Sequence, residues 1–180
     1  MRRLSLFASV LIALAGCAST ATRPVQPVAA PVSAEPSSAR TVEPTVSSSA
    51  VTLGDYHSGQ EPAKLLRAAM SAAAKDHHNV LVAFGTDGCP GCRALAELSV
   101  DPQVAPLLAY YHVVNIDIGQ FDRNLDIATQ LFVDLRTSGS PALVVIAPNG
   151  HIKVATNDGS FSNARTMTAS QVAAFLDTWR

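Results

Sequence analysis

The sequence predicts an α/β fold, with a central mixed sheet of about four to five strands flanked by helices. Short runs of apolar and β-branched residues predict strands, and apolar residues at helical spacing lie between these runs. The chain has 180 residues, which leaves room for one domain and its flanking segments. Its 13 Lys and Arg residues balance 14 Asp and Glu residues, so the composition argues against binding of nucleic acid.

The first elements of the domain are expected to be an amphipathic helix and a buried strand. Glu61 and Pro62 predict the start of the helix, which should end near Asp76. The apolar face of this helix consists of Leu65, Leu66, Ala69, Met70 and Ala73. Residues 80–84 form a continuous apolar run, which is typical of a strand buried on both faces.

The middle of the domain alternates between helices and one strand. A turn leads to a helix over 93–98 and, after Asp101 and Pro102, to a short helical piece. Residues 111–118 are rich in β-branched residues and predict a second strand. Another helix is expected after Asp122. Its apolar face consists of Leu125, Ile127, Ala128, Leu131 and Phe132.

The last part of the domain combines a hairpin with a helix. Residues 142–147 and 151–155 predict two strands joined by a turn at 148–150. Thr168 and Gln171 fit a capping box that begins the last helix. The inner face of that helix is expected to carry Val172, Phe175, Leu176 and Trp179. In this order of elements, helical crossovers join parallel strands, and the hairpin closes an antiparallel edge.

Residues 1–16 predict an export signal. Arg2 and Arg3 precede an uncharged, mostly apolar stretch over 4–15 that is too short to cross a bilayer as a helix. The four residues that end at Cys17 (LAGC) resemble the lipobox of bacterial lipoproteins. This resemblance implies cleavage before Cys17 and lipidation of that residue. The alternative is an ordinary secretory signal followed by a chance cysteine.

The residues after Cys17 suggest where the protein goes and how the domain is tethered. In lipoproteins, an alanine in the position of Ala18 implies sorting to the outer membrane of a Gram-negative cell, with the domain facing the periplasm. Residues 17–52 are dominated by Pro, Ser, Thr and Ala, which cannot build a core, and so predict a disordered tether. Residues 53–180 are then the single globular domain.

Two cysteines of the domain form the sequence Cys89-Pro90-Gly91-Cys92, directly after a predicted buried strand and at the start of a predicted helix. Unpaired backbone N–H groups and the positive end of the helix dipole stabilise a thiolate at such a place, which makes the sulfur a nucleophile. The second cysteine, one turn further on, is placed to attack the resulting mixed disulfide. The pair therefore predicts dithiol–disulfide chemistry.

The domain resembles the thioredoxin superfamily in two motifs. Residues 84–92 carry the dithiol, and residues 139–144 match the cis-proline loop that faces it in the family. This resemblance implies a thioredoxin-like fold without a cofactor, with Cys89 as the attacking thiol and Cys92 as the resolving thiol. Substrate contacts are implied at Ser140, Pro141, Pro90 and Gly91. Residues 101–104 (DPQV) are most similar to periplasmic thioredoxin-like proteins.

The sequence also departs from thioredoxins proper. Gly88 stands where they have Trp, and the residues between the cysteines are Pro-Gly instead of Gly-Pro. Ala83 takes the position of their buried acid, so proton transfer at the second thiol must be assisted by water or another group. Pro90 removes one N–H donor near the Cys89 sulfur. Asp87 is expected to be a solvated turn residue that could raise the pKa of Cys89.

The dithiol has two other interpretations. An exported domain sits in an oxidising compartment, where a Cys-x-x-Cys ring can stay closed as a structural disulfide. Two thiolates also supply half of a tetrahedral metal shell, but no histidine is spaced to complete it, so no metal site is predicted. The five histidines are interpreted as solvated or half-exposed residues: His57, His77, His78, His112 and His151.

Taken together, these features predict an outer-membrane lipoprotein whose domain is a thiol–disulfide oxidoreductase. Its partners are expected to be thiols or disulfides of exported proteins and a redox protein that recycles the dithiol. The membrane would be contacted through lipidated Cys17. The alternatives are a non-catalytic binding or assembly module with a structural disulfide and a metal carrier, with copper as the metal.

Overall fold

The computed structural model describes residues 52–180, so the predicted signal peptide, Cys17 and all but the last residue of the predicted tether lie outside the described residues. Within the described part, no helix combines the length and the apolar character needed to cross a membrane.

Helices and strands follow one another in an order close to the prediction. The first four elements are α1 (Pro62–Asp76), β1 (Asn79–Gly85), α2 (Pro90–Ser99) and α3 (Ala105–Leu108). The middle four are β2 (Tyr111–Asp117), α4 (Leu125–Gln130), α5 (Leu135–Ser138) and β3 (Ala142–Ile146). The last three are β4 (Ile152–Ala155), the 3₁₀ helix η1 (Ala164–Thr166) and α6 (Ala169–Trp179).

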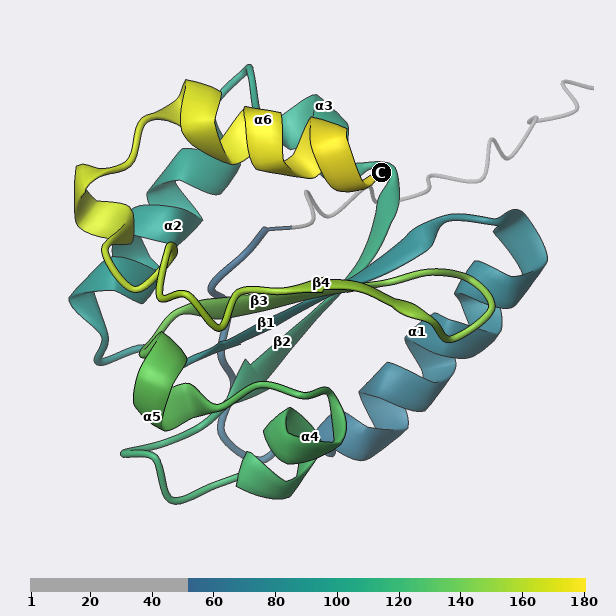
Figure 1. Cartoon of the computed structure of the whole chain (residues 1–180), viewed down its shortest axis with the longest axis horizontal. Coiled ribbons are helices and arrows are strands. Elements are labelled where there is room, and N and C mark those ends of the chain that lie inside the picture. Colours follow the sequence, from purple (N-terminus) through teal and green to yellow (C-terminus); the bar gives the residue numbers. More distant parts are fainter. Residues whose placement is uncertain (1–51) are drawn as a thin grey trace, which may run out of the picture. The chain divides into compact units, whose positions relative to one another are not determined.

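The strands form one mixed sheet in the order β2-β1-β3-β4, which confirms the predicted α/β class. Strand β1 pairs with β2 in parallel and with β3 antiparallel, and β3 pairs antiparallel with β4. Helices α1, α4 and α5 cover one face of the sheet, and α2, α3 and α6 cover the other (Figure 1).

Strand β1 is the centre of the core. All seven of its residues are buried. Val80, Val82 and Phe84 pack into the core on the α1 side, whereas Leu81 and Ala83 pack into the core on the α2 and α6 side. A strand covered on both faces has no solvated side, which explains its continuous apolar sequence.

The prediction that helical crossovers join parallel strands is wrong for the connection between β2 and β3. Strand β2 ends at Asp117 opposite Gly85, and β3 begins at Ala142 opposite Phe84, so the connection begins and ends at the same end of the sheet. Helix α4 has 6 residues and α5 has 4. With a rise of about 1.5 Å per residue, neither is long enough to return along β2.

The helical face predicted after Asp122 is only partly correct. Helix α4 ends at Gln130, and Phe132 adopts a left-handed backbone with φ 57° and is 76% exposed. The chain bends there, so the buried apolar residues that follow are Val133 and Leu135 instead. The sequence also does not predict α5, because four residues are too few to show a helical period.

The last helix begins as predicted. The hydroxyl of Thr168 accepts a hydrogen bond from the backbone N–H of Gln171, and the Gln171 side chain accepts one from the backbone N–H of Thr168. Val172 and Leu176 are fully buried in the core, while Phe175 and Trp179 are half-buried and pack against the same core. The capping box thus fixes where α6 starts, and the packing of Val172 and Leu176 sets the face that it buries.

Candidate active site at the dithiol

The two cysteines lie where β1 gives way to α2. Strand β1 ends at Gly85, a turn follows, and Cys89 is the N-cap residue of α2. Its Sγ accepts a hydrogen bond from the backbone N–H of Cys92 at 3.1 Å, as a serine or aspartate oxygen does at an ordinary N-cap. Cys89 and Cys92 are joined in a disulfide, with their Cα atoms 5.2 Å apart.

The two sulfurs differ in exposure. Cys89 is half-buried, whereas Cys92 is 1% exposed because it sits inside the first turn of α2. A large nucleophile can therefore reach the Cys89 sulfur but not the Cys92 sulfur. This asymmetry fits the order of attack that the sequence predicts, with Cys89 reacting first.

The loop at Ser140 and Pro141 lies directly against the dithiol. The Ser140–Pro141 peptide bond is cis. A β-carbon added to Gly91 would lie 3.1 Å from Pro141 Cδ and 3.2 Å from the carbonyl oxygen of Ser162, so the loop packs closely on the first turn of α2. Pro141 and Gly91 are both buried, so of the predicted substrate-contact residues only Ser140 and Pro90 line the open pocket beside Cys89.

Ser140 contributes more to the site than its place in the loop suggested. Its hydroxyl oxygen lies 3.2 Å from the Cys92 Sγ and 3.6 Å from the Cys89 Sγ, and its carbonyl oxygen lies 3.4 Å from the Cys89 Sγ. A hydroxyl can donate a hydrogen bond to a thiolate on either cysteine once the disulfide is open. The sequence identified Ser140 as a substrate contact, and its proximity to both sulfurs emerges only from the fold.

Ala83 stands at the position where thioredoxins proper have a buried acid. Ala83 is fully buried in the core on the α2 and α6 side. Asp87 is exposed in the turn before Cys89, as the sequence predicts. A residue of the site that the sequence does not single out is Tyr56, which is buried beside Gly85 and Cys92. It lies in an irregular segment before α1, where no periodic pattern draws attention to a single aromatic residue.

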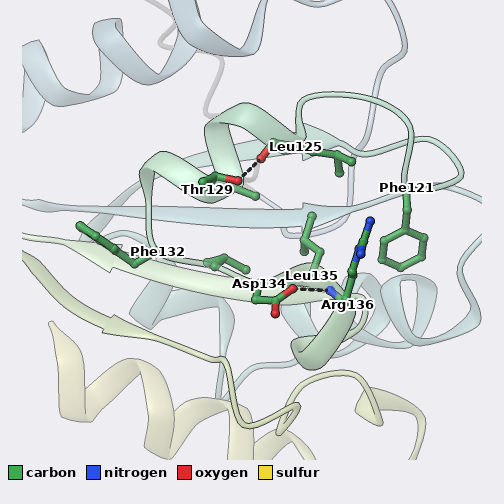
Figure 2. Close-up of a pocket in the computed structure, with 9 residues that line it drawn as sticks. Phe121, Leu125, Thr129, Phe132, Asp134, Leu135 and Arg136 are labelled. Atoms are coloured by element: carbon green, nitrogen blue, oxygen red, sulfur yellow. Dashed lines mark hydrogen bonds between the residues drawn. The ribbon is translucent and has the colours of Figure 1, made fainter.

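The half-buried Cys89 lines a pocket of about 250 Å³. The pocket is lined by Thr86, Gly88, Cys89, Pro90, Gly119, Gln120, Phe121 and Ser140. Phe121 also lines a larger, mostly apolar pocket of about 540 Å³ between α4 and α5 (Figure 2). Phe121 is 47% exposed and has a left-handed backbone with φ 63°.

One cluster of histidines lies at the opposite end of β1 from the dithiol. Within residues 52–180, the one group of three potential metal ligands is Asp76, His78 and His112, whose ligand atoms all lie within 4.8 Å of one another. His112 pairs with Val80 at the start of β1, whereas Cys89 follows the other end of that strand. The hydrogen bond from His112 is the main cause that holds the pKa of Asp76 below its ordinary value. Among the described residues, no histidine lines the pocket at Cys89.

A mixed sheet, a Cys-x-x-Cys pair at the N-terminus of a helix and a cis-proline loop against that pair define a thioredoxin-fold dithiol protein. The comparisons agree with this class. The family model described as Thioredoxin-like matches residues 62–148. The disulphide isomerase from Xylella fastidiosa Temecula1 is 30% identical, with a TM-score of 0.66, and the match covers 69% of this chain and 95% of that protein. The chain therefore belongs to the thioredoxin-like family.

A second solved structure resembles the chain more distantly. The reduced C-terminal domain of DsbD from Neisseria meningitidis is 17% identical, with a TM-score of 0.49, and the match covers 67% of this chain and 97% of that domain. None of the curated proteins compared with the chain matches it.

Proposed function

We propose that this protein is a thiol–disulfide oxidoreductase that acts on cysteines of exported proteins through the Cys89–Cys92 couple. The observation that carries the proposal is the arrangement of one half-exposed and one buried sulfur at the N-terminus of α2, bonded to each other and facing the cis-proline loop. The Xylella relative is named a disulphide isomerase, which supports the same class of reaction.

The exchange proceeds in two steps. First, a client thiolate attacks the Cys89 Sγ, the bond between the two protein sulfurs breaks, and its electron pair passes to Cys92 as a thiolate. Second, another thiolate of the client attacks the client sulfur of this mixed disulfide, which closes a client disulfide and releases Cys89 as a thiolate. In the reverse direction, the Cys92 thiolate attacks the Cys89 Sγ of the mixed disulfide and expels the client thiolate. The Cys92 N–H, 3.1 Å from the Cys89 Sγ, and the N-terminal end of the helix dipole stabilise negative charge on Cys89.

We propose further that the protein is anchored to the outer membrane and faces the periplasm. The support is the order of Arg2 and Arg3, the apolar stretch over 4–15, and Cys17 followed by Ala18. This localisation would place the dithiol among exported proteins and would require a redox partner that recycles it.

Trapping of the mixed disulfide tests the proposed activity. Cys92→Ser leaves Cys89 able to attack but removes the thiol that resolves the adduct. Client proteins should therefore accumulate in mixed disulfides with Cys89, and a reductant should cleave these complexes. Cys89→Ser is the matched control and should trap nothing, because the Cys92 sulfur is buried. If neither variant forms adducts and strong reductant barely opens the wild-type disulfide, the protein is the alternative module with a structural disulfide.

A further inference from the structure

The hydroxyl group of Tyr56 is buried without a hydrogen-bond partner. The side chain of Tyr56 is 1% exposed. Across residues 52–180, its hydroxyl oxygen is the one buried side-chain nitrogen or oxygen atom that has no partner. Buried polar groups are nearly always paired, because leaving one unpaired is unfavourable. The unpaired hydroxyl therefore calls for an explanation in a second state of the protein.

The hydroxyl lies next to the buried sulfur. Gly85 ends β1, and a β-carbon added to it would collide with Tyr56 Cζ and with the Tyr56 hydroxyl oxygen. The same β-carbon would lie 2.8 Å from the Cys92 Sγ. The hydroxyl and the sulfur therefore border the same small space, which exists because residue 85 has no side chain.

The segment that carries Tyr56 is held in place from two sides. The side chain of Asn115 on β2 accepts a hydrogen bond from the Gly54 N–H at 3.1 Å and donates one to the Thr52 carbonyl at 3.0 Å. A β-carbon added to Gly54 would lie 2.9 Å from Ala96 Cβ and 3.0 Å from the Cys92 carbonyl oxygen, so the segment packs directly on α2. These contacts fix Tyr56 relative to Cys92.

The chemistry of the sulfur changes when the disulfide opens. A disulfide sulfur is a weak hydrogen-bond acceptor, whereas a thiolate carries a full charge and is a strong one. The Cys92 sulfur is bonded to Cys89, lies 3.2 Å from the Ser140 hydroxyl oxygen and borders the space at Gly85 that Tyr56 also borders, and Ala83 carries no carboxylate. Burial, and secondarily the negative charge of Asp87, raises the pKa of Tyr56, so its hydroxyl stays protonated and able to donate.

We propose that the Tyr56 hydroxyl donates a hydrogen bond to the Cys92 thiolate when the disulfide opens, and so stabilises the reduced dithiol in place of a buried acid. This role rests on the proposed oxidoreductase function. As a client thiolate attacks Cys89, the electron pair of the broken S–S bond moves to Cys92, and Tyr56 binds the new charge while keeping its own proton. In the reverse step, the same hydrogen bond is lost as Cys92 attacks Cys89.

The test uses Tyr56→Phe in the full chain, with Tyr111→Phe as the matched control. Tyr111 is also a buried tyrosine, but its hydroxyl donates to the Leu176 carbonyl at 2.6 Å, far from the dithiol in the core beside α6. In equilibrium with glutathione, Tyr56→Phe should shift the dithiol toward the disulfide by about tenfold or more, the size expected for a lost hydrogen bond to a charged group. Tyr111→Phe should leave this equilibrium unchanged.

A second measurement does not depend on client exchange. In a chain that carries Cys17→Ala and Cys89→Ser, Cys92 is the only thiol, and its titration can be followed by the ultraviolet absorbance of the thiolate, which needs no reagent to reach the buried sulfur. Adding Tyr56→Phe should move this titration to higher pH, because the thiolate loses its donor. An unchanged glutathione equilibrium together with an unchanged Cys92 titration would overturn the proposal. Failure of the proposed function would differ, because wild-type protein would then neither exchange with glutathione nor trap clients.

Discussion

Ser140 and Cys92 lie 48 positions apart in the sequence, yet the hydroxyl oxygen of Ser140 is 3.2 Å from the Cys92 Sγ. Ser140 precedes the cis bond to Pro141, and Gly139 ends α5 with a positive φ of 68°. Helix α5 and the cis-proline loop thus carry a polar side chain to the buried sulfur.

Ser140→Ala removes the hydroxyl that lies close to both sulfurs. Because a hydroxyl can donate to a thiolate, the reduced dithiol should become less stable, and the pKa of Cys89 should rise. The rate of alkylation of Cys89 near neutral pH should fall by several-fold, to about tenfold. Ser170→Ala is the control, since Ser170 bonds Gln103 on the surface. Equal alkylation rates in wild type and Ser140→Ala would show that the hydroxyl does not act on the sulfurs.

Phe121→Ala tests whether client proteins use the apolar wall of the pocket at Cys89. Phe121 lines that pocket and is 47% exposed, so its removal should raise KM for protein clients while leaving exchange with glutathione unchanged. A few-fold to tenfold increase in KM corresponds to the loss of an apolar contact worth about 1 kcal/mol. Phe132→Ala is the matched control. Phe132 is also exposed and also has a left-handed backbone, but it does not line the pocket at Cys89. A similar increase in KM in both variants would contradict the prediction.

Asp134→Ala should lower the thermal midpoint, and the effect should depend on pH. Asp134 caps α5, and hydrogen bonds from the Thr137 hydroxyl and the Arg136 N–H hold its pKa below the ordinary value. A carboxyl with a depressed pKa in the folded state stabilises above its unfolded pKa and loses this effect as pH falls through the folded pKa. The thermal midpoints of the wild type and of Asp134→Ala should therefore differ near neutral pH and converge in acid. A difference that persists in strong acid would mean that the cap acts without its charge.

Cys17→Ala tests the anchor. If Cys17 is lipidated, this variant should lose membrane association, while the domain keeps its fold. Fractionation of cells into membrane and soluble material, with circular dichroism of the purified domain, measures both effects. Sedimentation identical to that of the wild type would contradict the lipobox interpretation.

Much of the fold could be predicted because local sequence patterns report it directly. The continuous apolar run of β1, the helical spacing in α1, and the capping box of Thr168 and Gln171 each depend on residues close in sequence. The same holds for Cys89 and Cys92, since they lie three residues apart between a strand and a helix that the sequence itself predicts.

The remainder depended on contacts between distant segments. The antiparallel direction of β3 follows from the short helices between it and β2, and the chain turns at Phe132 before Val133 and Leu135 enter the core on the α1 side. Tyr56 lies beside Cys92 only because Asn115 and α2 hold its segment and Gly85 leaves room. The sequence by itself determined the dithiol and the class of fold, because these are local. Which polar groups surround the buried sulfur was decided by tertiary structure, because packing alone brings residues 56, 92 and 140 together.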